Sequence, residues 1–464
     1  MNRTPLTRQL IERFGAIVGA DAIFTDAADC LPYGYDNSRL QATPQAVLFA
    51  TGADQVADIA RLCHQHDIPL VTRGKGTGTT GATVPQQGGV VLSLERMNRI
   101  LEIDADNRLA RVEPGVTNKA LQEALAAEGF FWPPDPTSAP VCTLGGNLAY
   151  NSAGPRAVKY GTPRENTLGL RAVTGTGECI RTGVKTTKGV VGYDLTRLLI
   201  GSEGTLAIIT EATLKLTPLP EVRRTLQASY RDIHAAARAV SSIMRRPVIP
   251  CALEFMDGTA IRMVREFSDL QLNDEVGALL MIEVDGAAHS IEAEAASVAE
   301  AARVEGLLEI HTARTGEEVT RLWKTRKALS PALRNIAPKK INEDVVVPVS
   351  RIPELIEGLE QLSAASGITI VNFGHAGNGN IHVNLLLDPD DPQQLAAGES
   401  CLASVFELVL RLDGTLSGEH GIGVVKRAFV AQEIDPVSLG LMRAIKRQFD
   451  PRNILNPGIV FPAE

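Results

Sequence analysis

The first half of the chain alternates short apolar runs with segments of helical spacing. Residues 47–50 and 68–72 are apolar runs of strand length, and residues 54–66 between them have the spacing of an amphipathic helix. This order predicts a strand–helix–strand unit at the start of a mixed α/β region. The pattern continues with predicted strands at 89–94, 100–103 and 109–112, a helix at 117–128 and a hairpin at 168–182.

The pattern changes near Pro218 and Pro220, where we predict a domain boundary. Beyond it, strand and helix patterns alternate, which is typical of an α+β domain with an antiparallel sheet and helices on one face. The predicted strands lie at 224–230, 251–256, 278–284, 307–312 and 344–348. The predicted helices lie at 232–244, 258–266, 289–304, 316–329 and 352–365.

One long passage of the first half, residues 132–166, is rich in Gly, Pro and Asn. It is too long for a simple connection, and long loops inside compact domains are often functional. We therefore regard it as a candidate functional segment. Farther along, residues 201–206 lead into a predicted strand pair that closes near Pro218.

Composition and charge narrow the classes of protein. A chain of 464 residues holds two or three domains of roughly 100–200 residues each. The formal net charge of −8, without a segment dense in Lys and Arg, argues against nucleic-acid binding. The sequence has no run of about 18 apolar residues, so we predict no membrane span. No apolar block follows Arg3 and Arg8, so we predict no secretory signal. The six cysteines form no C-x-x-C pair, which favours reduced thiols in the cytoplasm.

The segment Gly76-Thr77-Gly78-Thr79-Thr80-Gly81 matches the pattern G-x-G-x-x-G. A Rossmann loop must open a helix, whereas Pro85 and Gly88 follow here and prevent one. Closely spaced glycines let backbone N–H groups approach a phosphate, and Arg73 and Lys75 add positive charge. The segment therefore predicts a phosphate cradle, with an ordinary tight turn as the alternative.

Two glycine-rich segments hold three of the eight histidines. In the first, two apolar runs flank a Gly/Asn turn, so that a hairpin would bring His375 and His382 together. The second is Ser417-Gly418-Glu419-His420-Gly421. Two imidazoles and a carboxylate are a ligand set for a divalent metal that leaves positions open for a substrate. From spacing alone, the coincidence of ordinary histidines is the alternative, and His420 could itself be a metal ligand.

At these segments, and over almost its whole length, the chain resembles flavoproteins of the vanillyl-alcohol-oxidase type. The branch that it resembles holds D-lactate dehydrogenase, the flavin subunit of glycolate oxidase and D-2-hydroxyglutarate dehydrogenase. The resemblance is carried by Arg73–Gly81, Pro134–Ser138, Thr143–Asn147, Asn151–Gly154, Tyr160-Gly161, Gly201–Thr210, the two histidine segments and Phe449–Gly458.

The resemblance implies an α+β fold with a vanillyl-alcohol-oxidase/PCMH-type FAD-binding domain at residues 1–220. An α+β substrate (cap) domain with an antiparallel sheet would follow at 221–420, and a C-terminal segment, 421–464, would return to pack on the FAD domain. FAD would be bound without a covalent bond, because relatives that attach it use a histidine of the glycine loop, and this loop has none. The residues implied to contact FAD are Arg73, Gly74, Lys75, Gly76, Thr77, Gly78, Thr79, Gly81, Pro134, Asp135, Thr137, Ser138, Thr143, Gly145, Gly146, Asn147, Asn151, Ser152, Gly154, Tyr160, Gly161, Glu203, Gly204, Ile208 and Asn456.

The resemblance also implies catalytic roles. His375, His382 and Glu419 would hold a divalent metal, zinc or manganese, and His420 would be the catalytic base. Arg326 would pair with the substrate carboxylate, although by its pattern alone it is an ordinary solvated residue of a charged helix. The implied enzyme is an FAD-dependent dehydrogenase that oxidises a small D-2-hydroxy acid to its 2-oxo acid.

The choice of substrate depends on one departure from the resemblance. D-2-hydroxyglutarate dehydrogenases carry a lysine shortly before the segment that corresponds to Asp344–Pro348. Here Asn342-Glu343 stands at that place, and Lys339 and Lys340 lie in a shifted register. D-lactate is therefore the favoured substrate, with D-2-hydroxyglutarate and glycolate as alternatives.

The sequence leaves the electron acceptor open between a quinone, a cytochrome and an electron-transferring flavoprotein. Any iron–sulfur cluster would lie on a partner, because the chain has no ferredoxin-like cysteine set. The competing functions are an oxidase that passes electrons to oxygen and a catalytically idle flavin- and metal-binding scaffold. A homodimer is the base-rate expectation. We expect a cytoplasmic location, with peripheral attachment to a membrane left open.

Overall fold

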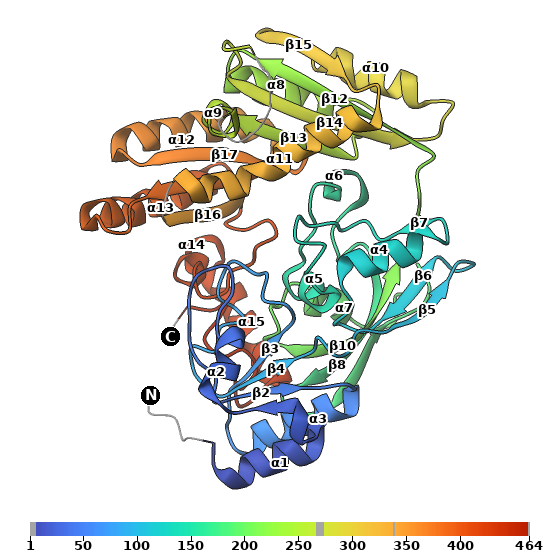
Figure 1. Cartoon of the computed structure of the whole chain (residues 1–464), viewed down its shortest axis with the longest axis vertical. Helices are drawn as coiled ribbons and strands as arrows, with labels where there is room; N and C mark the ends of the chain where they lie inside the picture. Colours follow the sequence, from blue (N-terminus) through green and yellow to red (C-terminus); the bar gives the residue numbers. More distant parts are fainter. Residues whose placement is uncertain (1–5, 266–272, 337–338, 463–464) are drawn as a thin grey trace. The chain divides into compact units, whose positions relative to one another are not determined.

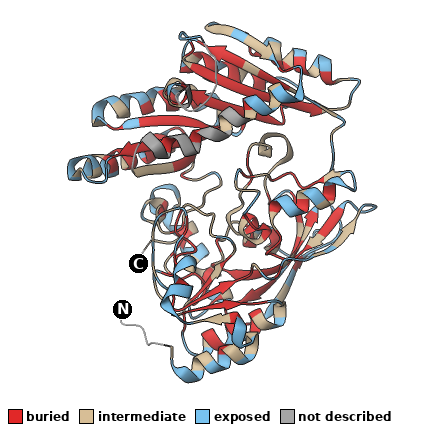
Figure 2. Ribbon diagram, viewed as in Figure 1, coloured by how far each residue is buried: buried red, intermediate tan, exposed pale blue. Residues whose placement is uncertain are grey.

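The computed structural model describes residues 6–265, 273–336 and 339–462, so the predictions that concern Arg3 and residue 266 lie outside the described residues. The chain forms two compact units. Unit 1 comprises Met1–Ala153, Gly161–Leu219 and Glu419–Glu464, and unit 2 comprises Gly154–Tyr160 and Pro220–Gly418. In both, buried residues concentrate in the strands and on the inner faces of the helices (Figure 2).

The unit boundaries lie within two residues of the predicted breaks at 220 and 420. One segment departs from the predicted ranges, because Gly154–Tyr160 belongs to unit 2 although the prediction includes it in the FAD-binding domain. Lys159 and Tyr160 hold it there, since the Lys159 ammonium and the Tyr160 hydroxyl both donate to the buried carboxylate of Asp285.

Unit 1 begins with a four-stranded sheet of order β1-β2-β4-β3, in which β4 is parallel to both β2 and β3 (Figure 1). The strand–helix–strand unit predicted from periodicity is β2, α3 and β3, and the buried side of α3, with Ile59 and Cys63, packs against Leu48 and Leu70. The bounds are α1 Arg8–Val18, β1 Ile23–Phe24, α2 Ala27–Cys30, β2 Ala46–Phe49, α3 Ala53–Gln65, β3 Leu70–Arg73 and β4 Val90–Ser93.

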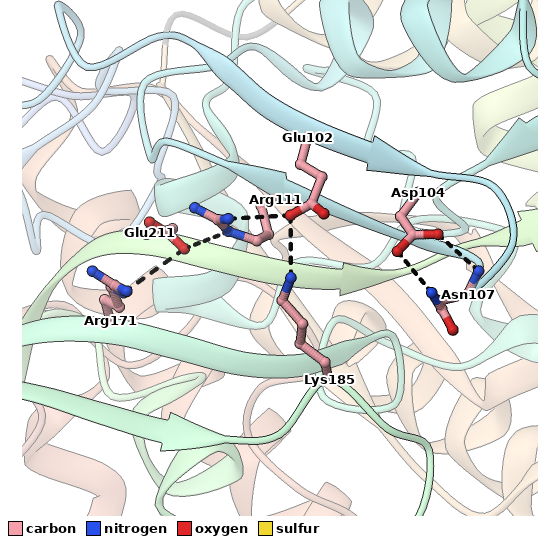
Figure 3. A network of polar contacts seen from close by, with 7 residues as sticks. All are labelled: Glu102, Asp104, Asn107, Arg111, Arg171, Lys185 and Glu211. Atoms are coloured by element: carbon pink, nitrogen blue, oxygen red, sulfur yellow. Dashed lines mark hydrogen bonds and ion pairs between the residues drawn. The ribbon is translucent and has the colours of Figure 1, made fainter.

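The second sheet of unit 1 is antiparallel, with the order β5-β6-β10-β8-β9. Along β6, Arg111 alternates with the buried Ala110 and Val112, so one face packs on the core and the other carries ions. On the ionic face Arg111 bridges Glu102 and Glu211 (Figure 3). The bounds are β5 Ile100–Asp104, β6 Leu109–Val112, β8 Thr167–Thr174, β9 Cys179–Gly183 and β10 Ala207–Lys215.

Two details of unit 1 correct the prediction. The strand pair expected after residue 206 is one long strand, β10, which pairs with β6 on one side and β8 on the other. The passage 132–166 contains helix α5, which starts at the Thr143 cap although Gly145 and Gly146 have a low helix propensity. The remaining elements of the unit are α4 Asn118–Ala126, β7 Phe130–Phe131, α5 Leu144–Tyr150, α7 Leu195–Leu199, β11 Thr217–Pro218, α14 Val430–Glu433 and α15 Pro436–Phe449.

The C-terminal segment is tied into unit 1 by backbone pairing and by buried polar groups. Leu70 and Leu455 form a parallel bridge, and the Asn456 side chain accepts from Thr72 N–H and donates to the Glu203 carbonyl. The buried Lys446 ammonium donates to the Leu455 carbonyl and to the Asp450 carboxylate. Residues 446–456 therefore contribute to the core of unit 1.

Unit 2 is built on a seven-stranded antiparallel sheet of order β15-β12-β14-β13-β17-β18-β16. Its strands are β12 Val222–Tyr230, β13 Ala252–Asp257, β14 Ala278–Gly286, β15 Leu307–Thr312, β16 Lys339–Val346, β17 Thr369–His375 and β18 Asn380–Leu387. Its helices are α6 Ala157–Tyr160, α8 Ile233–Met244, α9 Gly258–Arg265, α10 Ile291–Ala301, α11 Gly316–Ile336, α12 Ile352–Ser366 and α13 Pro392–Arg411.

Helices cover both faces of this sheet, which corrects the expectation of helices on one face. Met256, Met281 and Phe373 share a core with residues of α9 and α11. The alternate strand residues are buried as well, and every residue of β13 and β18 is buried. The helices α8, α10, α12 and α13 contact the same strands. Within the described ranges, no helix is long and apolar enough to cross a membrane.

The Lys446–Asp450 pair predicts a large loss of stability on truncation. Lys446→Ala leaves the Asp450 carboxylate buried without its cation, which costs about 3–5 kcal/mol of unfolding free energy. Lys119→Ala is the matched control, because Lys119 and Glu123 form a pair of the same spacing with exposed side chains, which contributes about 0–1 kcal/mol. Denaturant unfolding, monitored by the release of bound flavin, measures the stability of unit 1 in both variants. Equal losses in the two variants would contradict the assigned role of Lys446.

Candidate functional site

A cavity in unit 1 lies among the ends of β3, β10 and helix α5. Its lining encloses about 600 Å³ of space that includes open solvent. Nine of the residues implied to contact FAD line it: Arg73, Gly74, Thr143, Gly145, Gly146, Glu203, Gly204, Ile208 and Asn456. Thr72, Ala82, Thr83, Leu94, Pro114, Ala149, Tyr150, Leu199, Ser202, Ala207 and Ile209 complete the lining.

The glycines of this cavity allow close backbone approach. A Cβ atom added to Gly74 would lie 2.3 Å from the Thr143 hydroxyl oxygen, and one added to Gly145 would lie 2.7 Å from Pro114 Cβ. Gly78, in the glycine loop, has the same relation to the Tyr150 hydroxyl, at 2.8 Å. These three glycines therefore pack directly against neighbouring side chains, and the packing leaves no room for a side chain of their own.

The cavity also has polar atoms suited to a bound group. The buried Thr72 hydroxyl makes no hydrogen bond within the described part of the chain. Burial raises the pKa of the Tyr150 hydroxyl well above its usual value, and the nearby Glu203 carboxylate adds to this effect, so Tyr150 stays protonated at neutral pH. A glycine-lined cavity with hydroxyl donors fits a dinucleotide such as FAD.

The two cations predicted for the phosphate cradle have protein partners. The buried Arg73 guanidinium donates to the carbonyl oxygens of Tyr35 and Pro32, and Lys75 pairs with Glu95. The implied residues that do not line the cavity are Lys75, Gly76, Thr77, Gly78, Thr79, Gly81, Pro134, Asp135, Thr137, Ser138, Asn147, Asn151, Ser152, Gly154, Tyr160 and Gly161. For these residues, as for the nine that line the cavity, contact with FAD stays a prediction.

Glu203 joins the cavity to the glycine-rich segment that follows His420. Its carboxylate accepts from the backbone N–H groups of Ile422 and Gly423, at 2.6 and 2.8 Å. Its backbone has φ of +52°, an uncommon conformation for a residue with a side chain. Glu203 is therefore an anchor of the chain turn around His420 as well as a lining residue.

A second polar centre lies on one face of the unit 2 sheet, and strand register puts it there. Glu254 of β13 is opposite His375 of β17, and on β18 His382 is opposite both Phe373 and Asp344 of its neighbours. Residues that face each other across antiparallel strands point to the same side. The predicted hairpin thus exists, with its turn at residues 376–378, and both histidines are buried on one face.

His375, His382 and Glu419 each offer one ligand atom, and these atoms lie within 4.8 Å of one another. Metal–ligand bonds of about 2.0–2.2 Å keep ligand atoms within about 4.4 Å, so a small closure would suffice. Two imidazoles and a carboxylate fit zinc or manganese. The structure thus brings together the three side chains that the sequence nominated for a metal.

Asp344 fixes the chain just before Glu419. Its buried carboxylate accepts from the Ser417 hydroxyl and from the Gly418 N–H, and its backbone carbonyl accepts from the same N–H. The side chain of Asn380 donates to that carbonyl too. Since Glu419 directly follows Gly418, these bonds fix the backbone immediately before the residue that carries the Glu419 carboxylate.

Glu254 is the residue of this centre that sequence reasoning missed. One of its oxygens lies 2.7 Å from His375 Nδ1, and the other accepts from Arg326 Nε at 2.8 Å and lies 2.7 Å from Arg326 Nη2 as an ion pair. Burial alone raises the pKa of the Glu254 carboxyl, but His375 and Arg326 lower it below its usual value overall. The signal in the sequence was a single acid inside the apolar run 251–256.

The other residues predicted to act in catalysis or substrate choice are Arg326, His420, Lys339 and Lys340. Arg326 lies on α11 with its guanidinium 4.9 Å from the ring centre of Phe373, and its side chain is 11% exposed, so it is not an ordinary solvated residue. His420 follows Glu419 and is partly buried, and its backbone carbonyl accepts from the Thr80 hydroxyl. Lys339 and Lys340 lie at the start of β16.

A glycine-lined cavity in an α/β unit, followed by a unit with an antiparallel sheet, fits the class of FAD-binding oxidoreductases. Residues 44–183 match the model of the FAD binding domain, and residues 219–460 match that of the FAD linked oxidases, C-terminal domain. The chain therefore belongs to the FAD-linked oxidases of the vanillyl-alcohol-oxidase/PCMH type.

Relatives and solved structures agree with this assignment. Glycolate oxidase subunit GlcD of Bacillus subtilis is 38% identical over 98% of this chain and 97% of its own length. D-lactate dehydrogenase of Archaeoglobus fulgidus is 36% identical over 92% of this chain and 95% of its own. The structure of p-cresol methylhydroxylase with substrate bound matches 97% of this chain and 95% of its own, with a TM-score of 0.81 and 19% identity, and shows the fold.

The packing of Gly145 predicts a test of the FAD cavity. Gly145→Ala forces helix α5 away from Pro114, and overpacking of about 1–3 kcal/mol corresponds to roughly 5–150-fold weaker FAD binding. Gly440→Ala is the matched control, because Gly440 is also helical and nothing lies within 4 Å of an added Cβ. Its FAD affinity should stay at the wild-type value. Fluorescence titration of the apoprotein with FAD measures both, and an unchanged affinity in Gly145→Ala would contradict the placement of FAD.

Proposed function

We propose that this FAD-linked oxidoreductase oxidises a small D-2-hydroxy acid, D-lactate in the first place, to its 2-oxo acid. The observation that carries the proposal is the pairing of a three-ligand metal centre with a guanidinium through the one carboxylate of Glu254. A metal and a guanidinium side by side suit a molecule with a hydroxyl next to a carboxylate. The relatives named glycolate oxidase subunit and D-lactate dehydrogenase support the same substrate class.

In this proposal His375, His382 and Glu419 hold zinc or manganese. The metal, when bound, supplies Lewis-acid polarisation of the substrate hydroxyl. Arg326 binds the substrate carboxylate, and the Phe373 ring beneath its guanidinium limits the directions from which the carboxylate can approach.

His420 is the proposed base that accepts the hydroxyl proton. An imidazole suits this role because its pKa lies close to neutral pH. FAD, when bound in the cavity of unit 1, supplies the acceptor for the α-hydrogen and two electrons. The substrate thus loses one proton to the protein and two electrons with one hydrogen to the cofactor, which leaves the 2-oxo acid.

The preference for a monocarboxylate is supported by strand β16. Its alternate residues Lys340, Asn342 and Asp344 share the face of the metal centre, whereas Lys339 faces the other side. Lys340 is four residues from Asp344, or roughly 13 Å along a strand. A second carboxylate on a five-carbon acid therefore has no lysine at the matching position, which disfavours D-2-hydroxyglutarate.

A second candidate is glycolate oxidation within a larger assembly, because one relative is named as a subunit of glycolate oxidase. In either case we propose that electrons leave to an acceptor on a partner, which is a quinone, a cytochrome or an electron-transferring flavoprotein. Release of peroxide during aerobic turnover would instead indicate an oxidase. A cytoplasmic location, a homodimer and non-covalent FAD stay predictions.

The reaction itself is tested by anaerobic reduction of the bound flavin. D-lactate, L-lactate, glycolate and D-2-hydroxyglutarate are added separately, before and after treatment with a chelator. We expect D-lactate to bleach the visible absorbance, the chelator to abolish bleaching, and zinc or manganese to restore it, because the metal assists deprotonation. A yellow protein that none of these acids bleaches would contradict the reaction and favour an idle scaffold.

The role of His420 is tested by His420→Asn. Loss of a general base slows flavin reduction by about 10²–10⁴-fold, while the FAD content stays unchanged. His311→Asn is the control, since His311 is a half-exposed histidine on β15. Stopped-flow reduction measures both variants, and a wild-type rate in His420→Asn would remove His420 from the role.

A further inference from the structure

The Glu254 carboxylate lies between the two groups that the proposed reaction needs. We propose that Glu254 is a positioning residue that orients His375 for metal binding and Arg326 for substrate binding at the same time. The inference rests on the proposed function, since it assigns a role toward the same metal and substrate. It concerns a residue outside the ligand set, on a different strand, 121 positions away from His375 in sequence.

The contact with His375 fixes which ring nitrogen is available. A carboxylate only accepts hydrogen bonds, so the 2.7 Å contact requires the proton of the imidazole to be on Nδ1. In that tautomer Nε2 carries the lone pair, so Nε2 is the nitrogen that can ligate a metal. The contact is hard to avoid, because Glu254 and His375 are directly opposite in the β13–β17 register and both are buried.

The contact with Arg326 fixes the orientation of the guanidinium. Nε donates to one Glu254 oxygen and Nη2 lies 2.7 Å from the same oxygen as an ion pair, so this contact occupies one edge of the guanidinium. The edge formed by Nη1 and the second hydrogen of Nη2 stays available for a carboxylate. The Phe373 ring, 4.9 Å from the guanidinium carbon, holds the plane of the group from one side.

A purely structural role is the alternative, in which Glu254 only ties α11 to the sheet. The structure contains a matched contact of that kind. One turn earlier on α11, the indole N–H of Trp323 donates to Glu283 of the neighbouring strand β14, at 3.0 Å. Glu283 is nearly as buried as Glu254 and also anchors α11, but its hydrogen bonds and ion pairs within the described residues are with Thr225, Cys251, Trp323 and Arg223, not with His375 or His382.

The experiment compares Glu254→Gln with Glu283→Gln in the FAD-loaded, metal-free protein. A glutamine has one acceptor oxygen and one donor amide, so at residue 254 it cannot accept from both His375 and Arg326. We expect Mn²⁺ binding to weaken by about 10–100-fold in Glu254→Gln, as for the loss of other partners of metal ligands. Titration with Mn²⁺ gives the dissociation constant without any turnover. The free ion is detected by its electron paramagnetic resonance signal.

A second measurement separates positioning from damage to the fold. At saturating Mn²⁺, Glu254→Gln should raise the KM for D-lactate, because Arg326 loses its fixed orientation. A structural defect would instead lower the active fraction, and hence kcat and FAD content, with KM unchanged. Glu283→Gln should keep the wild-type Mn²⁺ affinity and KM.

The outcomes separate the inference from the function on which it rests. A wild-type protein that binds neither Mn²⁺ nor Zn²⁺ overturns both. A wild-type protein that binds Mn²⁺ while Glu254→Gln binds it equally well overturns the inference alone. Equal weakening in Glu254→Gln and Glu283→Gln also overturns it, because the effect would then come from loosening α11.

Discussion

Strand register in unit 2 is the constraint on which the candidate metal centre depends. Four adjacent strands, β13, β17, β18 and β16, place Glu254, His375, His382 and Asp344 on one face of the sheet. Because side chains alternate with a period of two, a slip of one residue in any pair would turn its polar residue to the opposite, apolar face. Helices cover both faces and all of β13 and β18 is buried, so such a slip would bury unpaired charge.

The same register accounts for two carboxylates that the proposed ligand set leaves out. Glu254 and Asp344 are buried, and each is saturated by donors of the protein, an imidazole and a guanidinium in one case and a hydroxyl and a backbone N–H in the other. A buried carboxylate must be paired or hydrogen-bonded to remain charged. Their charge therefore holds side chains and backbone in place, and Glu419 is the acid of the proposed ligand set.

Much of the molecule could be predicted from local pattern, and the failures have identifiable causes. The strand–helix–strand unit at 46–73 and the histidine hairpin follow from periodicity and turn residues, which act over short distances. Helix α5 was missed because two glycines outweigh its Thr143 cap in any local estimate, while packing on Pro114 requires at least one of them. The contact of Arg73 and Lys75 with a phosphate stays a prediction, and the structure adds protein partners that local pattern did not predict: Arg73 donates to the carbonyl oxygen of Tyr35, and Lys75 pairs with an acid 20 residues away.

Glu254 could not have been found by a motif, because its two partners lie 121 and 72 positions away on separate elements. The unpaired appearance of an acid in the apolar run 251–256 was nevertheless informative. Burying a carboxylate costs several kcal/mol unless cations or donors compensate it. An acid at the centre of a fully buried strand therefore implies a partner from elsewhere in the chain, and the basic and metal-ligating residues nominated by other motifs are the natural candidates. In this chain both nominated partners, His375 and Arg326, meet at that one carboxylate, so the buried acid connects two predictions that the sequence made separately.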